Sequence, residues 1–284
     1  MDTVWLIGLC GGLLGLVVGS FLNVVIYRLP IMLERDWRHR CHETLGQEAQ
    51  DAAPERFDLA KPRSRCPQCR HVITAMENIP VVSFVLQRGR CRHCGNPISM
   101  QYPLVEILTA VLSATVAIHF GWTPQAAAAL LLTWGLVALS GIDFRTQLLP
   151  DIVTLPGLWL GLSLALFPVF ASLQDSVIGA MAGYLSLWFV YQAFRLLTGK
   201  EGMGFGDFKL LALLGAWLGW QYLPTVVILS SVVGALFGIS MIVFRGRDRS
   251  VPMPFGPFLA AAGWITMIWG EQMTAAYLRF SGIS

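Results

Sequence analysis

The chain has 284 residues, of which 55% are hydrophobic and only 13% are charged. Soluble domains carry about 25% charged residues, so this composition excludes an ordinary soluble protein and predicts that most of the chain lies in lipid. The net charge of +3 is too small to suggest a nucleic-acid-binding protein, and we expect no nucleic-acid partner.

The first apolar run, Thr3–Tyr27, is long enough to form a transmembrane helix. A cleavable signal peptide needs a basic segment before such a run, and only Asp2 stands there, so we expect an uncleaved anchor. Twelve of the twenty Lys and Arg residues then lie between Arg28 and Arg92. We therefore predict a soluble insert over residues 28–101, with a mobile loop at Glu43–Asp58.

Residues 102–284 are expected to form a membrane core. Its seven apolar runs are Tyr102–His119, Gln125–Ile142, Ile152–Phe170, Ser176–Leu197, Phe208–Trp220, Leu223–Phe244 and Phe255–Leu278. With the first run they predict an all-α polytopic membrane protein of about eight transmembrane helices. The sixth of the eight segments, Phe208–Trp220, is short and could instead be one arm of a re-entrant hairpin.

The distribution of the basic residues predicts the orientation of the chain. With the N-terminus outside and the insert inside, nineteen of the twenty Lys and Arg residues are cytoplasmic, and only Arg279 is outside. Positive charge gathers on the cytoplasmic side of membrane proteins, so we expect this orientation.

Four of the six cysteines form two CxxC pairs, Cys66 with Cys69 and Cys91 with Cys94, separated by 21 residues. Two such pairs suit a tetrahedral zinc site, and four thiolate ligands leave no open position for chemistry. A disulfide is disfavoured on the cytoplasmic side, and one redox CxxC would not explain the second. We therefore predict a structural zinc, with His71 and His93 near it but not ligands, Cys10 as a packing residue, and no assigned role for Cys41.

Two aspartates adjoin the apolar runs at the same predicted membrane face. Asp143 directly follows the run Gln125–Ile142, and Asp207 follows Gly204 and Gly206 directly before the run Phe208–Trp220. Acids at such positions are costly and usually functional. Two carboxylates in a site of low dielectric are expected to share one proton, so that one activates water while the other donates to the scissile carbonyl group. The alternative for each is a helix cap, which is the role we expect for Asp151.

Together these residues resemble a family, the bacterial type IV prepilin peptidases, which are GxGD-type intramembrane aspartyl proteases also called leader peptidase/N-methyltransferases. The similarity covers nearly the whole chain. It rests on Gly19–Pro30, Cys66–Cys94 with Asn78-Ile-Pro80, Tyr102–Glu106, Asp143 with Leu149–Asp151, Gly202–Leu211 and Pro254–Phe258.

The resemblance implies an inner-membrane enzyme that cuts the basic leader from prepilins and type II secretion pseudopilins at the cytoplasmic face. It also implies N-methylation of the new N-terminal residue with S-adenosylmethionine. Asp143 and Asp207 then match the catalytic aspartates, with Gly204, Gly206 and Lys209 supporting the catalytic loop.

The methyl-donor site has no signature in the sequence, since no Gly-rich dinucleotide loop is present. Asn78 and Glu106 are candidates for methyl-donor or substrate binding, with local capping as the alternative. Three other functions stay open at this point: a leader peptidase without methyltransferase activity, an ion-coupled transporter, and a zinc-dependent protease, which the absence of HExxH disfavours.

Overall fold

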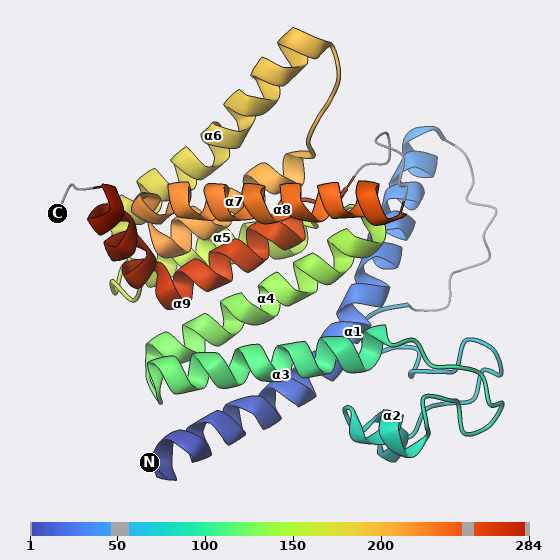
Figure 1. Cartoon of the computed structure of the whole chain (residues 1–284). Coiled ribbons are helices and arrows are strands. Elements are labelled where there is room, and N and C mark those ends of the chain that lie inside the picture. Colours follow the sequence, from blue (N-terminus) through green and yellow to red (C-terminus); the bar gives the residue numbers. More distant parts are fainter. Residues whose placement is uncertain (1, 47–56, 246–252, 282–284) are drawn as a thin grey trace. The chain divides into compact units, whose positions relative to one another are not determined.

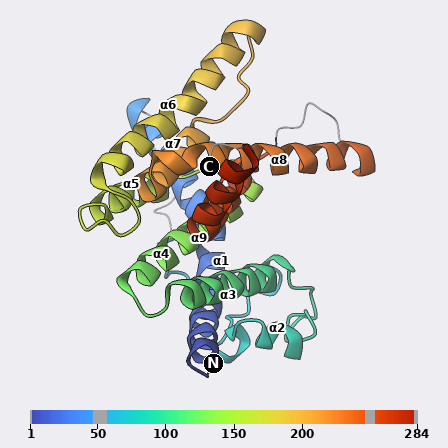
Figure 2. The same cartoon turned by 60° about the vertical axis from the view of Figure 1, so that its left-hand side comes forward.

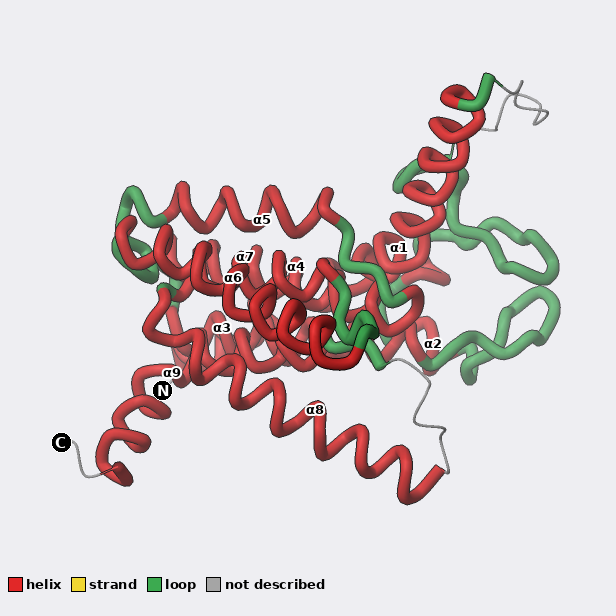
Figure 3. Tube along the Cα trace, turned by 90° about the horizontal axis from the view of Figure 1, so that it is seen from above, coloured by secondary structure: helices red, strands yellow, loops and turns green. Residues whose placement is uncertain are grey.

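The computed structural model describes residues 2–46, 57–245 and 253–281. Helices and loops account for the described residues, which contain no strand beyond two isolated bridges (Figure 3). The chain divides into two compact units, residues 1–122 and 123–284. The prediction of an all-α membrane protein is confirmed.

The first unit contains two long helices and the cysteine-bearing insert between them. Its elements are α1 (Asp2–Thr44), the 3₁₀ turn η1 (Met76–Asn78), the short helix α2 (Val82–Leu86) and α3 (Gln101–Phe120). Helices α1 and α3 pack along much of their length (Figure 1).

Small residues allow α1 and α3 to approach closely. Gly11, Gly15 and Gly19 recur every four residues and so lie on one face of α1. A Cβ atom added at Gly15 would stand 2.6 Å from the backbone oxygen of Thr109, and one at Gly11 would stand 2.6 Å from Cβ of Ala117. Such small-residue contacts are a common basis of helix pairing in lipid.

Helix α1 continues beyond the apolar run that ends at Tyr27. Its last turns carry pairs of opposite charge four residues apart, Glu34 with Arg38 and Asp36 with Arg40, which favour helix. Part of the predicted loop Glu43–Asp58 therefore belongs to α1, and residues 47–56 of it lie outside the described residues.

Arg28 ties the beginning of the insert to α1. Its buried guanidinium group donates hydrogen bonds to the backbone oxygens of Asp58 at 2.8 Å and Pro62 at 2.6 Å, and it lies over the ring of Phe57. The insert is thereby held beside the point where the apolar part of α1 ends.

The second unit is a helical bundle. Its elements are α4 (Pro124–Thr146), α5 (Asp151–Leu164), α6 (Leu173–Thr198), α7 (Phe205–Leu218), the 3₁₀ turn η2 (Trp220–Tyr222), α8 (Leu223–Arg245) and α9 (Gly256–Ser281). Helices α5, α6 and α7 lie side by side (Figure 2).

Helix α7 is the core of this bundle. Nearly every residue from Asp207 to Leu218 is buried, and a helix that is apolar all round is one that other helices enclose. It packs on α5, α6, α8 and α9. Its fourteen residues extend about 21 Å, less than the roughly 30 Å of a hydrocarbon core.

Each of the eight predicted segments corresponds to a helix. Five of them, α1, α3, α4, α6 and α8, are long and apolar enough to cross a membrane by length and composition. The run predicted to continue to Phe170 was too long, because α5 ends at Leu164. Pro168 explains this early end, since proline and the residue before it do not continue a helix.

Candidate functional site

Two buried aspartates meet in the second unit. Asp143 lies in the last turn of α4 and Asp207 in the first turn of α7, and their side chains are only 4% and 8% exposed. The two carboxyl groups are close enough to interact electrostatically. The structure therefore brings together the two acids that the sequence singled out, from helices about sixty residues apart.

A backbone N–H at the beginning of α9 completes this pair. Gly256 donates a hydrogen bond of 3.0 Å to Oδ2 of Asp143. The N-terminal turn of a helix carries unpaired N–H groups and a partial positive charge, so this contact stabilises an ionised carboxylate. Asp143 thus has a donor from α9 in addition to its neighbour Asp207.

Two glycines leave room for the carboxylates and for Leu149. A Cβ atom at Gly256 would lie 2.7 Å from Oδ2 of Asp143 and 3.1 Å from both methyl groups of Leu149. A Cβ at Gly206 would lie 2.7 Å from Cβ of Leu149, whose side chain is buried. At Gly204 the nearest atom would be Oδ2 of Asp207 at 3.9 Å, an ordinary contact. Gly206 and Gly256 are therefore required by packing, whereas Gly204 is not.

The four paired cysteines form one cluster in the first unit. The Sγ atoms of Cys66, Cys69, Cys91 and Cys94 all lie within 4.8 Å of one another, and those of Cys66 and Cys94 are 3.8 Å apart. Zn–S bonds of about 2.3 Å place tetrahedral sulfurs about 3.8 Å apart, so these residues fit a metal ion such as zinc.

The two CxxC turns have the same backbone design. Cys66 N–H donates to His71 O and Cys91 N–H to Asn96 O, at 2.9 and 2.8 Å. Each turn closes with a left-handed residue directly after its second cysteine, Arg70 in one and Gly95 in the other. The backbone N–H groups of Cys69 and Gln68 lower the pKa of the Cys66 thiol to about 6, whereas burial and the other three sulfurs raise the pKa of the Cys94 thiol to about 11. The proximity of the four sulfurs, and not these pKa values, therefore supports a metal site.

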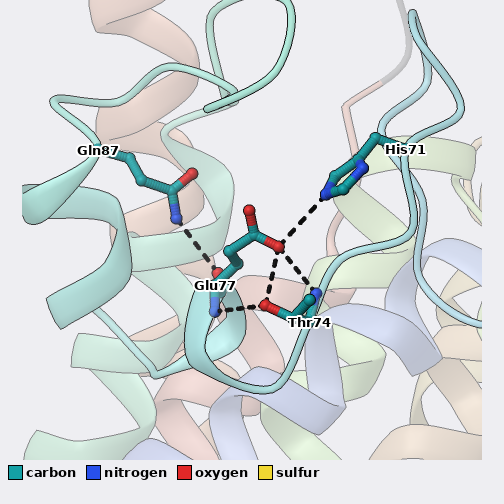
Figure 4. A network of polar contacts seen from close by, with 4 residues as sticks. All are labelled: His71, Thr74, Glu77 and Gln87. Carbon is teal, nitrogen blue, oxygen red and sulfur yellow. Dashed lines mark hydrogen bonds and ion pairs between the residues drawn. The ribbon is translucent and has the colours of Figure 1, made fainter.

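The two histidines near the cluster make other contacts. The rings of His71 and His93 stack with centroids 4.5 Å apart, and His71 Nε2 lies 3.5 Å from Oε2 of Glu77. Glu77 also accepts hydrogen bonds from Thr74, and Gln87 donates to its backbone oxygen (Figure 4). The backbone and side chain of Thr74, then His71, lower the pKa of the Glu77 carboxyl group.

Comparison with known proteins decides the family. Residues 130–239 match the model of the "Type IV leader peptidase family", and residues 13–120 match the "Bacterial Peptidase A24 N-terminal domain". The chain belongs to the type IV leader peptidase family. The recognition made from the motifs and the prediction of a peptidase are confirmed.

Proteins named "Prepilin leader peptidase/N-methyltransferase" are similar to this chain along almost its whole length. The one from Aeromonas hydrophila is 59% identical over 94% of this chain and 92% of its own. Those from Stutzerimonas stutzeri and Burkholderia pseudomallei are 56% and 51% identical, over 96% and 95% of this chain and 94% and 86% of theirs. No solved structure matches.

The helix-cap interpretations of the aspartates were wrong. The N-cap of α5 is Pro150, and Asp151 is the first residue of the helix, where its carboxylate pairs with Nζ of Lys209 on α7 at 2.7 Å. Gly204 is the N-cap of α7, so Asp207 lies inside its first turn. Lys209, named as support for the catalytic loop, thus connects α7 to α5.

The two candidates for methyl-donor or substrate binding differ in their surroundings. Glu106 is 7% exposed, and its Oε2 accepts a hydrogen bond of 2.7 Å from the backbone N–H of Val81. Asn78 is exposed in η1, and among the described residues no hydrogen bond joins its side chain to Glu106. Near Glu106, Asn23 of α1 donates to Tyr102 O, while its own buried Oδ1 has no partner.

Two members of the carboxylate site were not named from the sequence as site residues. Gly256 contributes its backbone N–H, a group that almost every residue type has and that the sequence therefore does not single out. Gly256 does lie within the Pro254–Phe258 motif. Leu149 was noted only as part of a motif, and its role follows from packing against two glycines distant in sequence.

Proposed function

We propose that this member of the leader peptidase family cleaves the short basic leader from type IV prepilins and type II secretion pseudopilins, and then N-methylates the new N-terminal residue. The observation that carries the peptidase half is the buried pair of Asp143 and Asp207. Two adjacent carboxyl groups in a site of low dielectric share a proton, which is the arrangement that acid–base hydrolysis of a peptide requires.

The hydrogen bond from Gly256 assigns different roles to the two acids. Because an N–H donor stabilises a carboxylate, Asp143 is the ionised member and Asp207 holds the proton. Asp143 removes a proton from water, whose oxygen attacks the scissile carbonyl carbon, while Asp207 donates its proton to the carbonyl oxygen. Collapse of the tetrahedral intermediate then breaks the C–N bond as the proton on Asp143 passes to the leaving amine, and a hydroxyl proton of the intermediate returns to Asp207, so both acids regain their starting states.

The membrane core explains how such an enzyme meets its substrate. A prepilin carries a long apolar helix directly after its leader, and a protease within the bilayer can bind that helix without removing it from lipid. In the proposed orientation the N-terminus is outside, the aspartates are at the cytoplasmic face of the inner membrane, and nineteen of the twenty basic residues are cytoplasmic.

We assign three parts to the chain: the first transmembrane helix (residues 1–27), a cytoplasmic zinc-binding domain associated with methyl transfer (28–101), and the peptidase core (102–284). Zinc held by the four cysteines would stabilise the insert, because the described residues in and around it contain only a few buried apolar side chains.

The methylation half rests on the family and on chemistry. S-adenosylmethionine supplies the methyl group when bound, and the acceptor must be a free, neutral α-amine, which exists only after cleavage. An α-amino group has a pKa of about 7.7–8.0, so a useful fraction is neutral in the cytoplasm. Glu106 and Asn78 remain the residues proposed for donor or substrate binding.

Mass spectrometry of a prepilin incubated with the purified enzyme tests both halves. Without S-adenosylmethionine we expect cleaved, unmethylated pilin, and with it a further mass of one methyl group. The variant with both Asp143→Asn and Asp207→Asn should leave the prepilin uncut but should methylate a pre-cleaved pilin. If it binds pilin and donor yet cannot methylate, the two reactions share the aspartates and the assignment of separate sites is wrong.

A further inference from the structure

We propose that α2 and the turn after it form a binding site for an anionic phospholipid at the membrane surface. Helix α2 presents one apolar face that stays exposed among the residues the structure describes: Val82, Val85 and Leu86 are 50%, 65% and 78% exposed. Their spacing of three and four residues places them on one side of the helix. Phe84, on another side, packs against Gly89 within the insert.

The contact with α3 sets the depth of this face. The N–H of Val81, directly before α2, donates to Glu106, which lies five residues after the beginning of α3 at Gln101. At 1.5 Å per residue, this contact is about 7.5 Å along the membrane helix from its end. Interfacial helices lie about 5–10 Å into the boundary between headgroups and acyl chains. Figure 1 shows α2 close to the beginning of α3.

A strained turn fixes α2 at this depth. Val81 has φ +60° and ψ −48°, and Val82 N–H donates to Pro80 O, which together make a classic γ-turn. A β-branched residue rarely adopts positive φ, so the turn needs an external partner to persist. That partner is the buried carboxylate of Glu106, and α2 is thereby anchored to the helix pair near the beginning of α3.

The turn after α2 supplies positive charge beside the apolar face. A hollow of about 420 Å³ is lined by Leu86, Gln87, Arg90, Cys91 and Arg92. Both arginines are exposed, and the apolar end of the hollow is the same Leu86 that belongs to the α2 face. The arginines and the apolar side chains match the two parts of a phospholipid: its phosphate would lie between the two arginines, and its acyl chains would lie along Leu86 and Val85. A soluble anion would leave the apolar face uncovered.

Photocrosslinking in the full-length enzyme tests the location. A benzophenone amino acid at Leu86 is compared with one at Trp37, an exposed aromatic position ten residues beyond the apolar run of α1. In nanodiscs containing phosphatidylglycerol we expect phospholipid adducts at position 86 and not at position 37. Absence of lipid adducts at position 86 would overturn the proposal. Crosslinks from position 86 to added prepilin in place of lipid would also overturn it, because they would show that this surface binds protein.

Lipid selectivity tests the charge. A variant with Arg90→Gln and Arg92→Gln is matched with one carrying Arg38→Gln and Arg40→Gln, which removes two exposed arginines from α1. Each arginine at a membrane surface is worth about a factor of five in binding anionic lipid, so the first variant should lose roughly 30-fold in preference for phosphatidylglycerol over phosphatidylcholine. Native mass spectrometry measures this preference, with metal content as the folding check. Equal losses in both variants would refute a specific site.

Discussion

Gly256→Ala should disable the peptidase without unfolding the chain, and the structure predicts why. The added methyl group would lie 2.7 Å from Oδ2 of Asp143, about 0.7 Å closer than the 3.4 Å at which ordinary contact begins. Both methyl groups of Leu149 lie 3.1 Å from the same added atom, so the space around it is restricted. The carboxylate must therefore shift and lose its hydrogen bond from the Gly256 N–H.

The size of the effect follows from that displacement. Misplacement of a reacting group by about 1 Å costs roughly 10²-fold in rate, which corresponds to about 2.7 kcal/mol of transition-state stabilisation. We expect kcat for prepilin cleavage to fall by about that factor while KM changes little, because the perturbed contact is one to the carboxylate of Asp143. Cleavage is followed by mass spectrometry of the released leader at several substrate concentrations.

Gly204→Ala is the matched control at a glycine of the same site. Its methyl group would meet nothing closer than 3.9 Å, and Gly204 has φ −78° and ψ 145°, which alanine adopts freely. It should cost at most a little helix stability, since alanine is a poorer N-cap than glycine. If Gly256→Ala kept more than half of the activity, or if Gly204→Ala lost as much as Gly256→Ala, the steric reasoning would be refuted.

Three further predictions follow from the sites. Asp143→Asn and Asp207→Asn should each leave under a few per cent of cleavage activity with substrate binding intact; more activity would remove that residue from the mechanism. Purified enzyme should hold about one zinc, and Cys66→Ser should lose it and make the insert sensitive to protease; unchanged resistance would contradict a structural metal. Because the folded pKa of Glu77 is lowered, its contribution to stability is full above the unfolded value of 4.5 and is lost as pH falls through the folded value. The protection of amides in residues 71–87, measured relative to their intrinsic exchange rate at each pH, should therefore fall in acid, and Glu77→Gln should abolish that dependence.

The sequence predicted those sites whose side chains are unusual for the segment in which they stand. Asp143 and Asp207 stand out because an acid beside an apolar run needs a reason, and the CxxC pairs stand out because their spacing is that of a metal site. The sequence also predicted where the long helices lie, since each predicted apolar run corresponds to a helix in the structure.

Contacts made by backbone groups and by packing could not be predicted in this way. The donor to Asp143 is 113 residues away and belongs to a glycine, so neither distance nor residue type indicates it. Asp151 has the local features of a helix cap, but its pairing with Lys209 depends on how α5 and α7 pack, which local sequence does not contain. The γ-turn at Val81 is likewise held by a partner on α3.

The glycine face of α1 has a consequence for biosynthesis. Helix α3 packs against Gly11, Gly15 and Gly19. Glu106 of α3, which packs against Gly19, is translated 87 residues after that glycine. At 5–20 residues per second, α1 waits in the bilayer for roughly 4–17 s before its partner is complete. During that interval the small-residue face of α1 lacks the partner that it has in the folded chain and is free to pair with another newly made helix.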